Sequence, residues 1–268
     1  MTGLRVITAV ILGALLLGII VLAPPLWTVL VIDAAVLIGA WEWSAFLRVR
    51  SCWPRAAYVL LTGLLLWFVS HWGMDPVVRG AILVVAALWW CTALAWIALA
   101  PHRVTRATAA LAGWLTLVPA GLGLLQLRLG PGLGLRWLLY VLFLVWTADT
   151  GAYFAGRAFG THKLAPQVSP GKTWEGALGG LVLVAALGAL AAPQLGKPAF
   201  SFAVVSVVIG AFSIVGDLSE SMFKRYAGLK DSGHLIPGHG GLMDRIDSIT
   251  AAAPLLLLAS AWPGAVTP

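Results

Sequence analysis

Apolar stretches of about 20 residues recur along the whole chain, and they constrain its fold more than any other feature. A helix needs about that length to cross a hydrocarbon core roughly 30 Å thick. Only 10% of the 268 residues are charged, whereas soluble domains carry about 25%. A closed barrel is the other architecture that can span a bilayer, but these runs lack the alternation of barrel strands. The sequence therefore predicts an all-α, polytopic helical bundle in a membrane.

The apolar runs and the breaks between them predict about nine transmembrane helices. The first run is longer than the apolar part of a signal peptide and lacks a convincing cleavage site, so we expect it to be retained. Glycines interrupt the region of the fifth and sixth helices. The expected spans are 5–23, 26–46, 56–70, 79–100, 107–127, 135–154, 174–192, 199–220 and 242–262.

Lys and Arg residues are distributed unevenly between the two sides of this topology. With the N-terminus inside, 13 of the 17 lie on the cytoplasmic side, and only Arg79, Arg128, Arg136 and Lys197 lie outside. Cytoplasmic loops are enriched in these residues. We therefore expect a multi-pass protein of the cell membrane with a cytoplasmic N-terminus. The same bias accounts for the net charge of +7 without a nucleic-acid partner.

Acidic residues concentrate in the second half of the chain, at the predicted cytoplasmic ends of the last four helices. Acids within membrane spans are costly and usually functional. Capping of helices or pairing with loop arginines is the alternative interpretation, most of all for Glu220 and Asp231. Asp33 and Glu42, in the second helix, are expected to pair with polar groups inside the bundle. The seven acids of the second half are Asp149, Glu175, Asp217, Glu220, Asp231, Asp244 and Asp247.

Helical spacing brings several of these acids onto common faces. Asp217, Ser221 and Lys224 are four and three residues apart, so they share a face if their helix continues. Asp244 and Asp247 share a face at the start of the last helix. Two helix ends could thus bring one acid each, Asp217 and Asp244, to one cation. Oxygen-only ligands favour Mg²⁺, which commonly binds one or two carboxylates together with substrate phosphates.

Basic and glycine-rich segments surround these acids, as phosphate binding requires. Lys224, Arg225, Lys230 and Arg245 can neutralise phosphate oxygens, and residues 237–241 (PGHGG) lead directly into the last helix. A helix N-terminus favours an anion. Lys172 and Ser169 similarly precede the helix expected from 174. The Gly-Lys-Thr triplet there is not a P-loop, because the preceding strand and the upstream glycine spacing are missing.

The two polar segments resemble those of the phosphatidate cytidylyltransferases, also called CDP-diacylglycerol synthases. The similarity covers about the last 120 residues, and the first half matches in hydropathy alone. One motif is Ser221-x-x-Lys224-Arg225, Lys230-Asp231 and His239-Gly240-Gly241-x-x-Asp244-Arg245-x-Asp247. The other is Asp149-x-x-Ala152-Tyr153 followed by Ser169-Pro170-x-Lys172-Thr173-x-Glu175-Gly176.

The resemblance implies an enzyme that makes CDP-diacylglycerol and pyrophosphate from CTP and phosphatidic acid. It also implies a homodimer and a requirement for Mg²⁺, with K⁺ as a second cation beside it. Asp217 and Asp244 are the expected metal ligands, while Asp149 and Asp247 complete the metal shell or orient basic residues. We expect 1–130 to be a scaffold with dimer contacts and 131–268 to be the catalytic region.

The remaining assignments leave open which substrate each residue binds. Lys172, Lys224 and Arg225 are expected to act in catalysis together with the two metal ligands. The expected substrate-binding set comprises Asp149, Lys163, Ser169, Thr173, Ser221, Lys230, His239, Gly240, Gly241, Arg245 and Asp247.

Two other functions remain open from the sequence. A related membrane nucleotidyl- or phosphotransferase could act on an isoprenoid lipid with the same residues. A transporter of a phosphorylated solute would instead carry midplane polar residues in both halves of the chain, whereas the observed charge lies at one face of one half.

Overall fold

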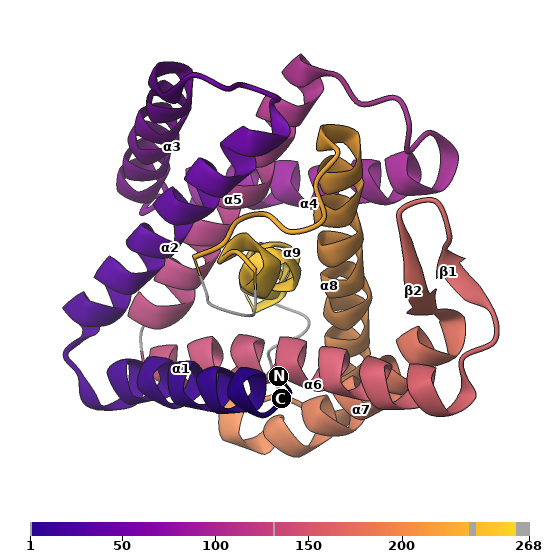
Figure 1. Ribbon diagram of the computed structural model, residues 1–268. Helices are drawn as coiled ribbons and strands as arrows, with labels where there is room; N and C mark the ends of the chain where they lie inside the picture. Colours follow the sequence, from indigo (N-terminus) through magenta and orange to yellow (C-terminus); the bar gives the residue numbers. More distant parts are fainter. Residues whose placement is uncertain (1, 131, 236–239, 261–268) are drawn as a thin grey trace.

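The computed structural model describes residues 2–130, 132–235 and 240–260, and this part of the chain forms nine α-helices and one small hairpin (Figure 1). The all-α fold class is confirmed. The first five helices are α1 (Thr2–Leu22), α2 (Pro25–Phe46), α3 (Cys52–Trp72), α4 (Pro76–Leu99) and α5 (Arg106–Leu129). The second half holds α6 (Gly134–Phe159), β1 (Lys163–Ala165), β2 (Ser169–Thr173), α7 (Trp174–Ala191), the 3-10 turn η1 (Pro193–Leu195), α8 (Ala199–Ala227) and α9 (Met243–Ser260).

Seven of the described helices, α2 to α8, are long and apolar enough to cross a membrane. This confirms a multi-pass membrane protein and agrees roughly with the expected nine spans. Helix α9 is not among the seven, because its 18 residues include Asp244, Arg245 and Asp247. Within α1, the apolar stretch that qualifies by composition is the shorter Gly13–Leu22.

Helix α9 lies in the middle of the bundle, seen end-on in Figure 1 with the other helices around it. Small residues let its neighbours approach closely. A Cβ atom on Gly123 of α5 would lie 2.8 Å from the backbone nitrogen of Pro254, and one on Gly216 of α8 would lie 2.6 Å from the carbonyl oxygen of Asp247. Contacts this short leave no room for a side chain. The glycine at 216 therefore brings Asp217 next to the first turns of α9.

Helices α6 and α7 pack together through a second set of small residues. A Cβ atom on Gly180 would lie 2.6 Å from the carbonyl oxygen of Ala148, and one on Gly179 would lie 2.2 Å from the Cβ atom of Ala155. The contact fixes α7 against the part of α6 that carries Asp149. The start of α7 is defined by Thr173, whose hydroxyl accepts a hydrogen bond from the Gly176 N–H at 3.2 Å.

The polar segment between α6 and α7 is a β-hairpin rather than the loop that the sequence suggested. Strands β1 and β2 are antiparallel, with Lys163 opposite Thr173 and Ala165 opposite Ser169. The buried side chain of Val168 anchors the turn between them, and its N–H donates to the Ala165 carbonyl at 3.1 Å. The hairpin gives Lys172 a fixed backbone directly before α7.

Helix α8 continues to Ala227, past the expected end near residue 220. Gly228, with φ of +74°, ends it in the left-handed conformation that glycine adopts readily. The extra turns keep Asp217, Ser221 and Lys224 on one continuous helix. These three residues therefore share one helical face, as expected if the helix continued past residue 220.

Candidate active site

A cavity of about 650 Å³ lies where α6, α7, α8, α9 and β2 meet. Four carboxylates contribute to its wall, those of Asp149, Asp217, Asp244 and Asp247. The bases Arg157, Lys172 and Arg245 line it as well. Carboxylates beside basic side chains are the combination that a metal-bound polyphosphate requires.

Asp217 and Lys172 form an ion pair across this cavity. Their side chains are 27% and 28% exposed, so both groups are accessible to a ligand. The Ser221 hydroxyl lies 3.5 Å from Asp217 Oδ1, one turn further along α8. The pair joins the two polar segments, because Lys172 comes from β2 and Asp217 from α8.

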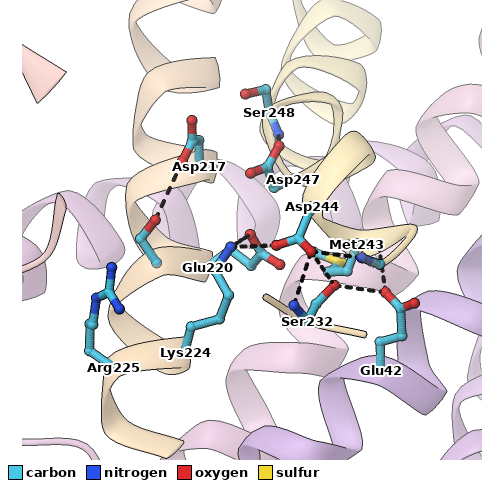
Figure 2. Close-up of polar contacts among 12 residues, drawn as sticks. Glu42, Asp217, Glu220, Lys224, Arg225, Ser232, Met243, Asp244, Asp247 and Ser248 are labelled. Carbon is cyan, nitrogen blue, oxygen red and sulfur yellow. Dashed lines mark hydrogen bonds and ion pairs between the residues drawn. The ribbon is translucent and has the colours of Figure 1, made fainter. Parts of the chain in front are cut away.

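Asp244 is the most heavily hydrogen-bonded acid of the site (Figure 2). Its Oδ2 atom accepts from the N–H and hydroxyl of Ser232, both at 3.0 Å, and from the Gly241 N–H at 2.8 Å. Its Oδ1 atom accepts from Lys224 Nζ at 2.6 Å. Asp244 lies in the first turn of α9, outside the seven spanning helices. Burial raises the pKa of this carboxyl, but the bonds from Lys224 and Gly241 outweigh burial and hold the pKa below its ordinary value.

Lys224 lies between two acids. Its Nζ atom is 2.7 Å from Glu220 Oε2 and 2.6 Å from Asp244 Oδ1. Glu220 is 1% exposed, and its other oxygen, Oε1, is buried without a hydrogen-bond partner among the described residues. The sequence left the role of Glu220 open. Its spacing of four residues from Lys224 was the signal for this pairing.

Asp247 is buried one turn beyond Asp244, and its Oδ1 atom accepts from the Ser248 N–H at 2.7 Å. Figure 2 shows Asp247 on α9 and Asp217 on α8 as neighbouring acids of two different helices. Their proximity follows from the close α8–α9 contact at Gly216.

Other expected site residues lie outside the cavity wall. Lys163 and Lys230 are exposed, Ser169 lies within the hairpin, and Arg225 Nε donates to the Val168 carbonyl at 3.4 Å. Gly240 has a φ of +83°, and the Gly241 N–H donates to Asp244 Oδ2. His239 lies outside the described residues.

Two cavity residues with polar side chains were given no role from the sequence. Tyr153 and Arg157 line the cavity from α6, and Arg157 Nη1 donates to the Tyr153 hydroxyl at 3.1 Å. They follow Asp149 by four and eight residues, which places all three on one helical face. That spacing was the signal that could have identified them.

The donor set of the cavity suits Mg²⁺. It offers carboxylate oxygens beside bases that can bind phosphate, and Mg²⁺ commonly takes one or two carboxylates with substrate phosphates completing its shell. Within the described ranges, groups of three or more His, Cys, Asp or Glu side chains positioned for a metal do not occur. A metal shared with a phosphorylated substrate would need only one or two of these carboxylates.

Comparison with known proteins places this site in a family. The model of the cytidylyltransferase family matches residues 3–261, nearly the whole chain. The chain belongs to the cytidylyltransferase family. Among its relatives, the phosphatidate cytidylyltransferase of Pseudomonas aeruginosa is 42% identical over 268 residues, covering 96% of this chain and 97% of the relative. That of Haemophilus influenzae is 39% identical over 274 residues, covering 93% and 95%, and that of Brucella suis is 36% identical over 264 residues, covering 95% and 91%. This cytidylyltransferase is thus similar to these relatives through both halves, including the part that showed only a match in hydropathy.

Proposed function

We propose that this chain is a phosphatidate cytidylyltransferase, which transfers CMP from CTP to phosphatidic acid and releases pyrophosphate. The names of its relatives support the substrates, and its apolar helices support a lipid environment. The combination of carboxylates and bases in one cavity supports phosphoryl chemistry.

The observation that carries this proposal is that the polar cavity adjoins an apolar groove. A groove of about 190 Å³, formed by α4, β1, α7 and α8, shares Leu164, Ala177 and Ile214 with the cavity. The other residues that line the groove are apolar, and they include Leu94 of α4 and Leu218 of α8. A phospholipid has a charged phosphate joined to acyl chains, so its two parts match the two adjoining compartments.

The chemistry requires little covalent work from the protein. An oxygen of the lipid phosphate attacks the α-phosphorus of CTP, and the bond to the β-phosphate breaks, so pyrophosphate leaves with the electron pair. Lys172, Arg157 and Arg245 line the space in which these phosphates would lie. Catalysis then rests on positioning and on neutralising charge.

The proposal includes Mg²⁺ held by Asp217 and Asp244, with Asp149 and Asp247 beside them. When bound, the metal would withdraw charge from the triphosphate and the leaving pyrophosphate. Lys172 and Lys224 already contact these acids, so they are placed to exchange a carboxylate for a phosphate. A K⁺ ion, a homodimer and an active site on the cytoplasmic side complete the proposal, the last supported by the distribution of Lys and Arg.

The test is turnover of CTP and phosphatidic acid by the protein purified in detergent, with Mg²⁺ and after chelation. We expect CDP-diacylglycerol only with Mg²⁺, and a loss of roughly a hundredfold or more in kcat for Asp217→Asn. Asp75→Asn is the matched control, because Asp75 caps α4 far along the chain from the site and asparagine also caps helices.

Near-normal turnover by folded Asp217→Asn would contradict the metal assignment. Preference for an isoprenoid glycerol phosphate over phosphatidic acid would instead favour the related lipid nucleotidyltransferase.

A further inference from the structure

Glu42 is a buried acid of the first half of the chain that reaches the site in the second half. It is 5% exposed, on α2, and the described structure gives it three hydrogen-bond donors. Its Oε1 atom accepts from the Leu242 N–H at 3.0 Å. Its Oε2 atom accepts from the Met243 N–H at 2.7 Å and from the Ser232 hydroxyl at 2.8 Å. The carboxylate thus holds the N-terminus of α9, where helix N–H groups lack partners within the helix.

The same contacts lead directly to Asp244. The Ser232 hydroxyl lies between the two carboxylates, 2.8 Å from Glu42 Oε2 and 3.0 Å from Asp244 Oδ2 (Figure 2). Asp244 in turn accepts from Lys224, which also contacts Glu220. The network therefore extends from α2 through the segment before α9 to the end of α8.

Two glycines bring the backbone close to the Glu42 carboxylate, where an added side chain would displace it. A Cβ atom on Gly241 would lie 2.4 Å from Glu42 Oε2 and 2.1 Å from the Ser232 hydroxyl oxygen. One on Gly233 would lie 2.6 Å from Glu42 Oε1. The chain on both sides of Ser232 and Asp244 is thus folded closely around this one carboxylate.

A second contact to the end of α8 comes from Arg48, two residues past the end of α2. Arg48, with φ of +55°, donates to the Tyr226 carbonyl, and its guanidinium carbon lies 4.2 Å from the Tyr226 ring centroid. Tyr226 lies in the last turn of α8. The last turns of α2 and the residues just after it therefore contact the chain where α9 begins and where α8 ends.

We propose that Glu42 is a positioning residue, which sets the orientation of Asp244 through Ser232 and the first turn of α9. The proposal rests on the proposed function in assigning Asp244 a role in nucleotidyl transfer. The N-terminal half is then part of the catalytic apparatus, because the geometry of an acid in the cavity wall depends on a side chain from α2.

Glu42→Gln is the informative variant, because it preserves size while replacing one acceptor oxygen by a donor. Both Glu42 oxygens accept from backbone N–H groups. In either orientation of the glutamine amide, its NH2 group would therefore face a backbone N–H, and that hydrogen bond would be lost. We expect kcat to fall about tenfold to a hundredfold with little change in KM, as for loss of transition-state positioning. Asp33→Asn is the matched control, a partly buried acid of the same helix nine residues earlier.

Hydrogen exchange separates positioning from simple capping, and it needs no substrate. If Glu42 only caps α9, exchange in Glu42→Gln speeds up at its own two donors, Leu242 and Met243. If it positions Asp244, exchange also speeds up at Ser232 and Gly241, whose N–H groups donate to Asp244.

A double-mutant cycle with Ser232→Ala gives a third readout. Ser232 links the two carboxylates, so the two substitutions should not act independently. The fold-decrease in kcat of the double variant should be much smaller than the product of the fold-decreases of the two single variants. Fold-decreases in kcat that multiply in the double variant would overturn the proposal. A kcat of Glu42→Gln within about twofold of that of the Asp33→Asn control would also overturn it. If the unaltered protein does not turn over CTP and phosphatidic acid, the proposed function fails. Exchange at Ser232 and Gly241 then decides the role of Glu42: unchanged rates overturn it.

Discussion

Charged side chains in this site are arranged as alternating acids and bases. Lys172 contacts Asp217, and Lys224 contacts both Asp244 and Glu220. Where water is excluded, an ion pair contributes little to the stability of the fold, but removing one partner leaves a buried charge that destabilises the fold strongly. Lys224, beside the buried Glu220, therefore has a structural task in addition to any contact with phosphate.

Loss of the Lys224 charge should destabilise the protein through the acid that stays behind. Lys224→Met leaves Glu220, which is 1% exposed, without its cation. We expect unfolding in detergent to become easier by about 3–5 kcal/mol, the usual cost of breaking a buried pair. Thermal unfolding measures this.

The double variant Lys224→Met/Glu220→Gln is the control for that explanation. Removing both charges should restore part of the lost stability, since no buried charge is then left without a partner. An equal or lower unfolding temperature in the double variant would show that packing of the Lys224 stem, not charge, caused the loss.

At the scale of elements, glycines decide which helices can carry the site. Gly216 brings α8 to α9, Gly123 brings α5 to α9, and Gly180 brings α6 to α7. Each contact includes backbone atoms, which cannot move aside as a flexible side chain can. The acids of the cavity therefore depend on interfaces formed by residues without chemistry of their own.

Gly180→Ala should separate α6 from α7, because the added Cβ would lie 2.6 Å from the Ala148 carbonyl oxygen. Overpacking of this kind costs typically about 1–3 kcal/mol, and the shift should also reduce kcat by moving Asp149 relative to Lys172. Gly80→Ala, within α4, is the matched control, since in the described part of the chain no atom outside the adjoining backbone of α4 lies within 4 Å of its Cβ position. That variant should be neutral or more stable by up to about 1 kcal/mol. Equal unfolding temperatures for the two variants would contradict this account of the interface.

For the whole molecule, the polar cavity and the apolar groove define how a lipid would lie. The groove is formed largely by α7, whose N-cap is Thr173, and by α8, which carries Asp217. One end of the substrate can therefore reach the acids while its chains stay among apolar side chains.

Ala211→Phe should obstruct that groove, because Ala211 contributes to its wall on α8. We expect KM for long-chain phosphatidic acid to rise by about tenfold or more, with KM for CTP unchanged. Val182→Phe, at an exposed position of α7 outside the groove lining, is the control. A rise in KM for CTP, or an equal effect of both variants, would argue against acyl-chain binding in the groove.

Orientation in the membrane can be tested with the native cysteines. Cys52, at the start of α3, is exposed and is expected on the cytoplasmic side, whereas Cys91 lies within α4. In a Cys91→Ser background, a membrane-impermeant maleimide should label Cys52 only after the cells are permeabilised. Met74→Cys in a chain lacking both native cysteines, at the exposed turn between α3 and α4, should label in intact cells. The reverse pattern would invert the proposed topology.

The sequence by itself determined the helical membrane fold, because apolar length leaves few alternatives in a bilayer. It also identified most of the acids and bases that line the cavity, namely Asp149, Lys172, Asp217, Asp244, Arg245 and Asp247. Helical spacing contributed for the acids, since residues three and four apart share a helical face. Tyr153 and Arg157 follow the same rule, but no role was assigned to them. The hairpin was not predictable from its polar, proline- and glycine-containing composition, which is typical of loops.

Only the tertiary structure decided how the site is completed. The pairing of Lys172 with Asp217, the burial of Glu220 beside Lys224 and the contacts of Glu42 with the start of α9 join residues from 4 to 201 positions apart. Local periodicity carries no information about which distant faces meet. The contacts among the helices, set by glycines and by the position of α9 in the bundle, supply that information.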